Sequence, residues 1–189
     1  TRLFVTLEVK GLEHLKDLNE PIIFMPNHTS YLDPLVVAMA LPLHKRIKLS
    51  FAAAYDVLYE YFWYVSSAAE LLFNAFALQR GDRGGIQLGL DHIGRMLDNG
   101  YSVVFFPEGK MSETGNLLPF RPGAALVAAH MNVAIIPIFI QGAQHILPYA
   151  KVLPRCCGTV SINFGKPLKF TRLDKQNDIL HALQQAMKN

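Results

Sequence analysis

The sequence predicts a single α/β domain, residues 1–189, in which helices flank a mostly buried central mixed β-sheet. Strand-like and helix-like segments alternate along the chain, which is the pattern of α/β folds. Several strand-like segments are uninterrupted apolar runs, as expected for strands that are covered on both faces. The 189 residues contain no internal repeat and no low-complexity linker, so one domain is expected.

The first third of the chain supplies two strands and the start of a helix. Residues 3–10 alternate between apolar and other side chains, which is the period of a half-buried strand. Residues 22–24 form a short apolar strand that ends at Met25–Pro26. Asp33–Pro34 then predicts a helix start, with the aspartate as its cap and the proline in its first turn.

A third strand and the best-marked helix follow. Residues 47–53 are predicted to be a strand, and residues 82–98 a helix that Asp82 can cap and Asn99–Gly100 can end. The apolar stripe of this helix consists of Ile86, Leu90, Ile93 and Leu97. After Asn99–Gly100, the apolar residues 103–106, which end at Pro107, predict the next buried strand.

Residues 122–150 contain no Asp, Glu, Lys or Arg and are long enough to cross a bilayer. Polar residues interrupt this run, and a proline lies within its β-branched part. It divides better into a helix at residues 122–131 and a buried strand at residues 133–140, so we reject a transmembrane segment. A strand at residues 159–164 and a helix from about Asp174, with Ile179, Leu183 and Ala186 on its apolar face, complete the domain.

The composition excludes several classes of protein. Hydrophobic residues make up 51% of the chain, charged residues only 17%, and the net charge is +3. A disordered tail, a coiled coil and a nucleic-acid module with dense charge are therefore excluded, so no nucleic-acid partner is expected. The two cysteines are adjacent, at Cys156 and Cys157, and can form neither a disulfide framework nor a four-thiol zinc site. The chain starts at Thr1 without a signal-peptide core, and we expect it to be an excerpt of a longer protein.

The densest polar cluster at a strand end is residues 27–33. Histidine is the side chain best suited to proton removal near neutral pH, and a carboxylate on its other ring nitrogen selects the tautomer. His28 and Asp33 are five residues apart across a strand-to-helix turn, so this contact is feasible. The alternative is that Asp33 only caps its helix and His28 is an ordinary loop residue.

A second cluster, residues 105–112, follows the predicted strand at 103–106. Glu108 and Gly109 come just after the carboxyl end of that strand, which is the usual position of a ligand crevice in open α/β sheets. Gly109–Lys110 does not belong to a nucleotide-binding P-loop, because the earlier glycine is missing and Met111 stands where Ser or Thr is required. The alternative is a surface turn.

Together these clusters resemble the lysophospholipid and glycerol-3-phosphate acyltransferase family, whose fold is then expected here. Residues 27–33 match its Asn-His-x-x-x-x-Asp motif, and residues 106–109 resemble the start of its Phe-Pro-Glu-Gly-Thr-Arg-Ser motif. Residues 76–80 are similar to an intervening block that ends in a phosphate-binding arginine, and residues 133–140 resemble the final apolar block. The four blocks occur in family order.

The resemblance implies transfer of a fatty-acyl group from an acyl-CoA or acyl carrier protein thioester to a lysophospholipid hydroxyl, with no metal and no other cofactor. His28 would be the general base on the acceptor hydroxyl, and Asp33 would orient its imidazole. The residues implied to bind substrate are Asn27, Arg80, Glu108, Gly109, Lys110, Ser112 and Arg121. A helix start near Arg121 could add backbone N–H donors to the phosphate site.

The sequence departs from the family pattern at one point. Lys110-Met111-Ser112 stands where the family has Thr-Arg-Ser, so the arginine expected to grip the phosphate is missing. Lysine is a point charge without the bidentate fork of arginine, which leaves the acceptor head group open. Two other functions stay open: a non-catalytic lipid-binding relative and, less favoured, a lipid esterase using Ser30, whose surroundings lack the glycines of a nucleophile elbow.

Two stretches suggest contact with a membrane. Residues 55–78 are rich in Tyr, Trp and Phe, which favour the bilayer interface, and predict either a membrane-contacting helix or a core helix. Residues 145–172 carry five Lys and Arg and no acidic residue, which predicts either an anionic-lipid contact or a solvated loop face. We expect a peripheral protein on the cytoplasmic face of a membrane.

Overall fold

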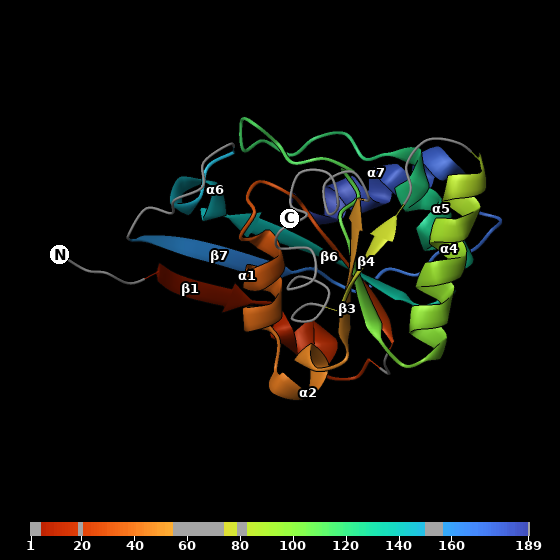
Figure 1. The fold of residues 1–189 in the computed structure, drawn as a ribbon, viewed down its shortest axis with the longest axis horizontal. Coiled ribbons are helices and arrows are strands. Elements are labelled where there is room, and N and C mark those ends of the chain that lie inside the picture. Colours follow the sequence, from red (N-terminus) through yellow and green to blue (C-terminus); the bar gives the residue numbers. More distant parts are fainter. Residues whose placement is uncertain (1–4, 19–20, 55–73, 79–82, 150–156, 189) are drawn as a thin grey trace.

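The computed structural model describes residues 5–18, 21–54, 74–78, 83–149 and 157–188 (Figure 1). The strands are β1 (Val5–Lys10), β2 (Ile22–Pro26), β3 (Leu49–Ala54), β4 (Ala75–Leu78), β5 (Ser102–Phe105), β6 (Ala134–Gln141) and β7 (Gly158–Phe164). The helices are α1 (Asp33–Ala40), α2 (Leu43–Arg46), α4 (Arg83–Asp98), α5 (Pro122–His130), α6 (Ala143–Ile146) and α7 (Gln176–Ala186), with a short 3₁₀ helix η1 (Leu12–Leu15).

The strands form one seven-stranded sheet in the order β1-β7-β6-β2-β5-β3-β4. Neighbouring strands are parallel except β6 and β7, which are antiparallel, so the sheet is mixed as the sequence predicts. Helices lie on both sides of it (Figure 1). The predicted α/β fold with a central mixed sheet is confirmed.

The central strands are apolar throughout because they have a hydrophobic core on each face. In β2, Ile22 and Phe24 point into a core shared with α1 and α6, whereas Ile23 and Met25 point into a core shared with α4, α5 and α7. This alternation follows from the two-residue period of a strand. All five residues of β2 are buried. A strand covered on both faces has no place for polar side chains, so polar residues gather at its ends.

The topology creates a crevice at the carboxyl ends of β2 and β5, which are parallel neighbours. From β2 the chain passes through α1 to β3, on the far side of β5. From β5 it passes through α5 to β6, on the far side of β2. The two connections therefore leave in opposite directions, and open α/β sheets bind ligands at such a switch point.

Several predicted elements need correction. Residues 75–78 are the short edge strand β4, paired with β3, and not part of an aromatic helix; four residues are too few to show a strand period. Residues 55–73 of the predicted membrane-contacting helix, and the expected cap Asp82, lie outside the described residues. Ile86, predicted on the inner face of α4, is exposed in the first turn of that helix.

Short helices account for the remaining differences from the predicted elements. η1, α2 and α6 have only four residues each, and none of them is predicted from the sequence. A single turn carries too little periodicity to be recognised. Within the described residues, no helix is long and apolar enough to cross a bilayer.

Candidate active site

His28 and Asp33 form a hydrogen-bonded pair just beyond the carboxyl end of β2. The strand ends at Pro26, and a loop carries His28 and turns into α1, which begins at Asp33. His28 Nδ1 lies 2.9 Å from Asp33 Oδ2. The imidazole is partly open, with a 19% exposed side chain, while the carboxylate is fully buried. A donor at Nδ1 leaves Nε2 as the ring nitrogen that can accept a proton.

The Asp33 carboxylate is held by the loop in front of it. Its Oδ2 also accepts hydrogen bonds from the backbone N–H groups of Thr29, at 2.6 Å, and Ser30, at 2.8 Å. Asp33 is the first helical residue, and Leu32 occupies the N-cap position without a side-chain cap bond. The prediction that Asp33 caps its own helix is therefore wrong, because its side chain folds back onto the histidine loop.

Glu108 joins the histidine loop to the loop that follows β5. Its Oε1 accepts a hydrogen bond from the backbone N–H of His28 and its Oε2 one from Leu118, each at 2.8 Å. Burial raises the pKa of this carboxyl, and the two backbone N–H groups offset part of that increase. Both oxygens have partners within the protein, so the visible work of Glu108 is to position His28. Its predicted contact with substrate stays a prediction.

Two more groups, on either side of the turn at Gly109, contact the histidine. Gly109 has a φ of +67°, and a Cβ there would lie 3.0 Å from Cγ of Arg121, so a glycine suits this position. Beyond the turn, the backbone N–H of Ser112 donates to the carbonyl of His28 at 2.8 Å. The ring of Phe106 packs against the imidazole, with centroids 4.2 Å apart. These contacts hold the histidine from several sides.

Asn27 fastens the other flank of the loop to β6. Its amide nitrogen donates to the carbonyl of Ile140 at 3.0 Å, and its amide oxygen accepts from the N–H of the same residue at 2.6 Å. The side chain is buried and its amide is paired on both sides with one backbone unit. Asn27 therefore joins the ends of β2 and β6, and its predicted substrate contact stays a prediction.

The hydroxyl of Ser30 is hydrogen-bonded to backbone groups, and not to a base as the nucleophile of an esterase would be. Its hydroxyl donates to the carbonyl of Leu147 at 2.8 Å and accepts from the N–H of Leu32 at 3.2 Å. The residue is fully buried. A serine nucleophile must donate its proton to a base and face the substrate. The geometry of Ser30 meets neither condition.

The predicted phosphate-binding residues divide into three groups. Lys110 and Arg121 are exposed, and Arg121 lies over the Gly109 turn, next to the start of α5. Ser112 is buried, and its hydroxyl has no hydrogen-bond partner among the described residues. Arg80 lies outside the described residues. Of the two cysteines, which are not among these predicted residues, Cys156 also lies outside the described residues and Cys157 is a free, exposed thiol.

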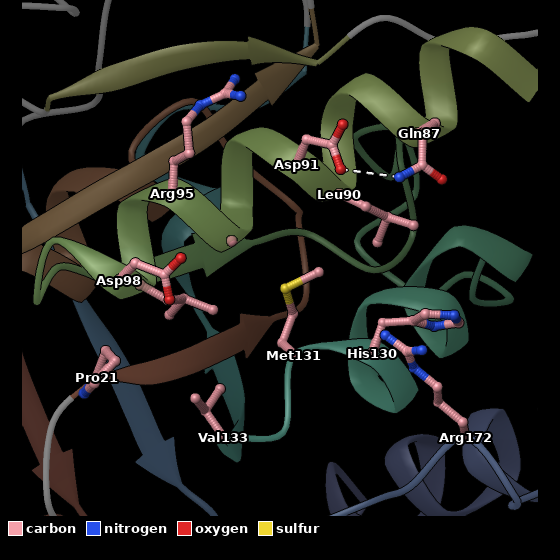
Figure 2. Close-up of a pocket in the computed structure, with 12 residues that line it drawn as sticks. Pro21, Gln87, Leu90, Asp91, Arg95, Asp98, His130, Met131, Val133 and Arg172 are labelled. Carbon is pink, nitrogen blue, oxygen red and sulfur yellow. Dashed lines mark hydrogen bonds between the residues drawn. The ribbon is translucent and has the colours of Figure 1, made fainter.

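A hollow of about 680 Å³ lies elsewhere, between α4, the end of α5 and the residues just before β2 and β6 (Figure 2). This is the amino-end side of β2, opposite to His28. In Figure 2 the side chains of Gln87 and Asp91 share a hydrogen bond of 2.9 Å. The hollow contains no base-and-carboxylate pair like His28–Asp33 among the interactions of the described residues. Among the residues that the structure describes, no cluster of His, Cys, Asp and Glu could hold a metal ion.

Sequence reasoning did not single out three groups that position the histidine. Phe106 packs on the imidazole, and the backbones of Leu118 and Ile140 bind the side chains of Glu108 and Asn27. Phe106 adjoins Pro107–Glu108, so its place in the motif was the available signal. The backbone partners leave no signal in the sequence, because any residue type offers the same N–H and C=O.

Comparison with known proteins bears on this geometry. The model of a family described as acyltransferase matches residues 6–141, which contain both clusters around His28 and Glu108. The chloroplastic 1-acyl-sn-glycerol-3-phosphate acyltransferase LPAT1 of Arabidopsis thaliana is 30% identical over 90% of this chain and 46% of its own length. A glycerol-3-phosphate acyltransferase of Shewanella sp. (strain W3-18-1) is 27% identical over 79% of this chain and 20% of its own length.

A solved structure resembles the whole fold. The crystal structure of the 1-acyl-sn-glycerophosphate acyltransferase PlsC from Thermotoga maritima matches with a TM-score of 0.72 and 22% sequence identity. The match covers 98% of this chain and 71% of that chain. The chain thus spans less than half the length of the curated relatives described above.

Proposed function

This chain belongs to the acyltransferase family, and on that premise we propose that it transfers a fatty-acyl group to the free hydroxyl of a lysophospholipid such as 1-acylglycerol-3-phosphate. The acyl donor is a thioester, of coenzyme A or of acyl carrier protein. The observation that carries the proposal is the hydrogen bond of 2.9 Å between His28 and the buried Asp33. This bond supports the proposal because it leaves Nε2 as the ring nitrogen that can accept a proton, at the crevice where α/β sheets bind ligands.

His28 acts as the general base of the reaction. Its Nε2 takes the proton of the acceptor hydroxyl while the hydroxyl oxygen attacks the carbonyl carbon of the thioester. The tetrahedral intermediate then collapses, the C–S bond breaks, and the thiolate takes the proton from the imidazolium. The products are the new ester and the free thiol. The attack is direct, so the protein needs no nucleophile of its own.

Asp33 stabilises the imidazolium that exists between the two proton transfers. Its negative charge lies against Nδ1, and the N–H groups of Thr29 and Ser30 hold the carboxylate in place. A buried charge acts through a lower dielectric than one in water and is screened less by salt. Glu108 and Asn27 contribute by fixing the loop on which the histidine lies.

The phosphate of the acceptor binds on the exposed side of the Gly109 turn. Lys110 and Arg121 are both exposed there, and α5 begins immediately after Arg121. A helix start offers backbone N–H groups and a positive dipole end to an anion. With Lys110 in place of the family threonine and Met111 in place of its arginine, Arg121 supplies the guanidinium nearest this turn among the described residues.

The test uses purified protein, radiolabelled acyl-CoA and a panel of lysophospholipids that includes 1-acylglycerol-3-phosphate. We expect a diacyl product, reduced about 10²–10⁴-fold in His28→Ala because a positioned general base contributes that factor. The matched control is His181→Ala, which removes an exposed histidine on α7. Free fatty acid as the sole product would indicate a hydrolase. Lipid binding without any turnover would indicate a non-catalytic relative.

A further inference from the structure

Five large apolar side chains, one at every fourth residue, are exposed between the turn before α1 and the residue that ends α2. They are Tyr31 (37% exposed), Leu35 (42%), Met39 (56%), Leu43 (68%) and Ile47 (68%). We call this set the outer stripe. Half of the large apolar side chains that are exposed in the described part of the chain belong to it. A spacing of four residues keeps side chains on one face of a helix, so Leu35 and Met39 lie on the same face of α1.

Helix α1 is apolar on both of its faces. Its inner face, with Val36, Val37 and Ala40, is buried in the core that α1 shares with the sheet. Its outer face carries Leu35 and Met39, and residues 34–43 include no polar side chain at all. A helix that faces water normally has polar residues on its outer face. In Figure 1, α1 and α2 lie on the side of the sheet away from α4 and α5, so these helices do not cover the stripe.

Basic residues accompany the far end of the stripe. Residues 34–54 contain no Asp or Glu. His44, Lys45 and Arg46 lie between Leu43 and Ile47 in the sequence, and Lys48 follows Ile47. The guanidinium of Arg46 donates to the carbonyls of Met39 and Leu41, at 3.2 and 3.1 Å, and so fastens α2 to the end of α1. Apolar side chains next to cations, without acidic residues, are complementary to the surface of an anionic bilayer.

The near end of the stripe adjoins the candidate active site. Tyr31 lies on the same loop as His28 and Asp33, between them in sequence. We propose that the outer stripe docks on a membrane that contains anionic lipid, with Leu35, Met39, Leu43 and Ile47 inserted among the head groups. This inference rests on the proposed function for its purpose, because docking there lets a lipid acceptor reach His28 from the bilayer. The docking itself is measured without any reaction.

Flotation with lipid vesicles tests the docking. The vesicles are phosphatidylcholine with and without phosphatidylglycerol, and the variant is Met39→Ser/Leu43→Ser. Loss of two partly inserted apolar side chains is expected to weaken partitioning at least about tenfold. The matched control is Ile86→Ser/Leu88→Ser, which changes two exposed apolar residues of α4 on the other side of the sheet and is expected to bind as the wild type does.

The cations give a second, independent variant. Lys45→Gln/Lys48→Gln is expected to lose most of the gain in binding that phosphatidylglycerol confers, and to leave binding to pure phosphatidylcholine nearly unchanged. Added salt is expected to weaken the wild type toward the level of this variant. The proposal would be overturned if flotation with phosphatidylglycerol were unchanged in Met39→Ser/Leu43→Ser or in Lys45→Gln/Lys48→Gln, or if the α4 control lost as much binding.

Activity measurements separate this inference from the proposed function. Met39→Ser/Leu43→Ser is expected to lose turnover of an acceptor embedded in vesicles and to keep that of a short-chain, water-soluble acceptor. Absence of turnover in the wild type would count against the function, while flotation would still decide the docking. A wild type that does not float, but forms a dimer that this variant dissociates, would assign the stripe to a second copy of the chain and overturn membrane docking.

Discussion

The two ends of β2 show opposite ways of arranging polar side chains. At its carboxyl end, Asn27, Asp33 and Glu108 are almost completely buried, and each is hydrogen-bonded to backbone groups. At its amino end, the charged side chains around the hollow of Figure 2, such as Asp91 and Arg172, are exposed. The hollow of about 680 Å³ is thus at the end without the buried network.

We therefore place the candidate site at the end of β2 with the buried polar network and not at the end with the hollow. Burying a polar group without partners is costly, so such a group persists only where its hydrogen bonds are complete or it serves a purpose. The bonds of Asn27 and Glu108 join segments 113 and 80 residues apart in sequence. Exposed side chains such as those around the hollow keep their contacts with water, so their presence adds little desolvation cost and is weak evidence for a functional role.

The largest effect is expected from Asp33→Asn, in the buried network at the carboxyl end of β2. The amide oxygen can take the place of Oδ2 and keep the bonds from the loop, since Oδ1 has no partner among the described residues. Only the charge beside His28 is lost. We expect acyl transfer to fall at least about 10²-fold with little change in secondary structure, because the imidazolium loses its counter-charge. The checks are kcat/KM and circular dichroism; an unchanged kcat would remove Asp33 from the mechanism.

The next largest effect is expected from Glu108→Ala. It leaves the partly buried N–H groups of His28 and Leu118 without their carboxylate, at a cost of about 3 kcal/mol in unfolding free energy. Urea denaturation measures this, with Glu113→Ala, which removes an exposed carboxylate on the same loop, as the control. Equal stability of the two variants would mean that burial of Glu108 has no structural weight.

The difference in unfolding free energy between the wild type and Glu108→Ala is also expected to depend on pH. Burial raises the pKa of Glu108, so the folded protein holds this proton more tightly than the unfolded chain does. Between the ordinary glutamate pKa and the raised one, the unfolding free energy of the wild type relative to Glu108→Ala therefore falls as pH rises, by at most about 1.4 kcal/mol per pH unit. Above that interval the difference is constant. A difference that instead grows with pH would reverse the assigned direction of the pKa shift.

A smaller loss is expected when the tie between β2 and β6 is cut. Asn27→Leu leaves the N–H and the carbonyl of Ile140 without their side-chain partner, for about 2 kcal/mol of destabilisation. Activity is expected to fall as well, since His28 follows directly. Asn177→Leu, an exposed position on α7, serves as the control in the same urea titration. A loss of activity with full stability would instead favour the predicted substrate contact of Asn27.

The smallest effect is expected at the hollow. Asp91→Asn/Arg172→Gln changes two exposed charges that line it, and we expect unfolding free energy to change by less than about 0.5 kcal/mol and acyl transfer to stay the same. Urea denaturation and the transfer assay provide the measurement. A marked loss of activity would contradict the assignment of the site to the carboxyl end of β2, because the amino end would then take part in function.

Most of the central sheet was predictable from the sequence, because a strand buried on both faces is an apolar run that can be recognised without knowing its neighbours. Residues 22–24 and 133–140 are apolar runs of strand length, and β2 and β6 lie there with ends shifted by one or two residues. By contrast, β4 and the one-turn helices η1, α2 and α6 were missed, because their conformation depends on what packs against them. Asp33 was misread as a cap for the same reason: its partner is the preceding loop.

For the candidate site, the sequence alone supplied the residue types: a histidine with a carboxylate five residues later after one strand, and a Pro-Glu-Gly turn after another. Residue types and spacing suffice to predict a base and its carboxylate, because general-base proton transfer would use those groups. The tertiary structure alone decided how they are used. It placed the carboxyl ends of β2 and β5 side by side, turned Glu108 inward to the backbone of His28, and left the outer stripe exposed. These are long-range contacts between segments distant in sequence, and backbone partners and uncovered faces leave no local pattern to read.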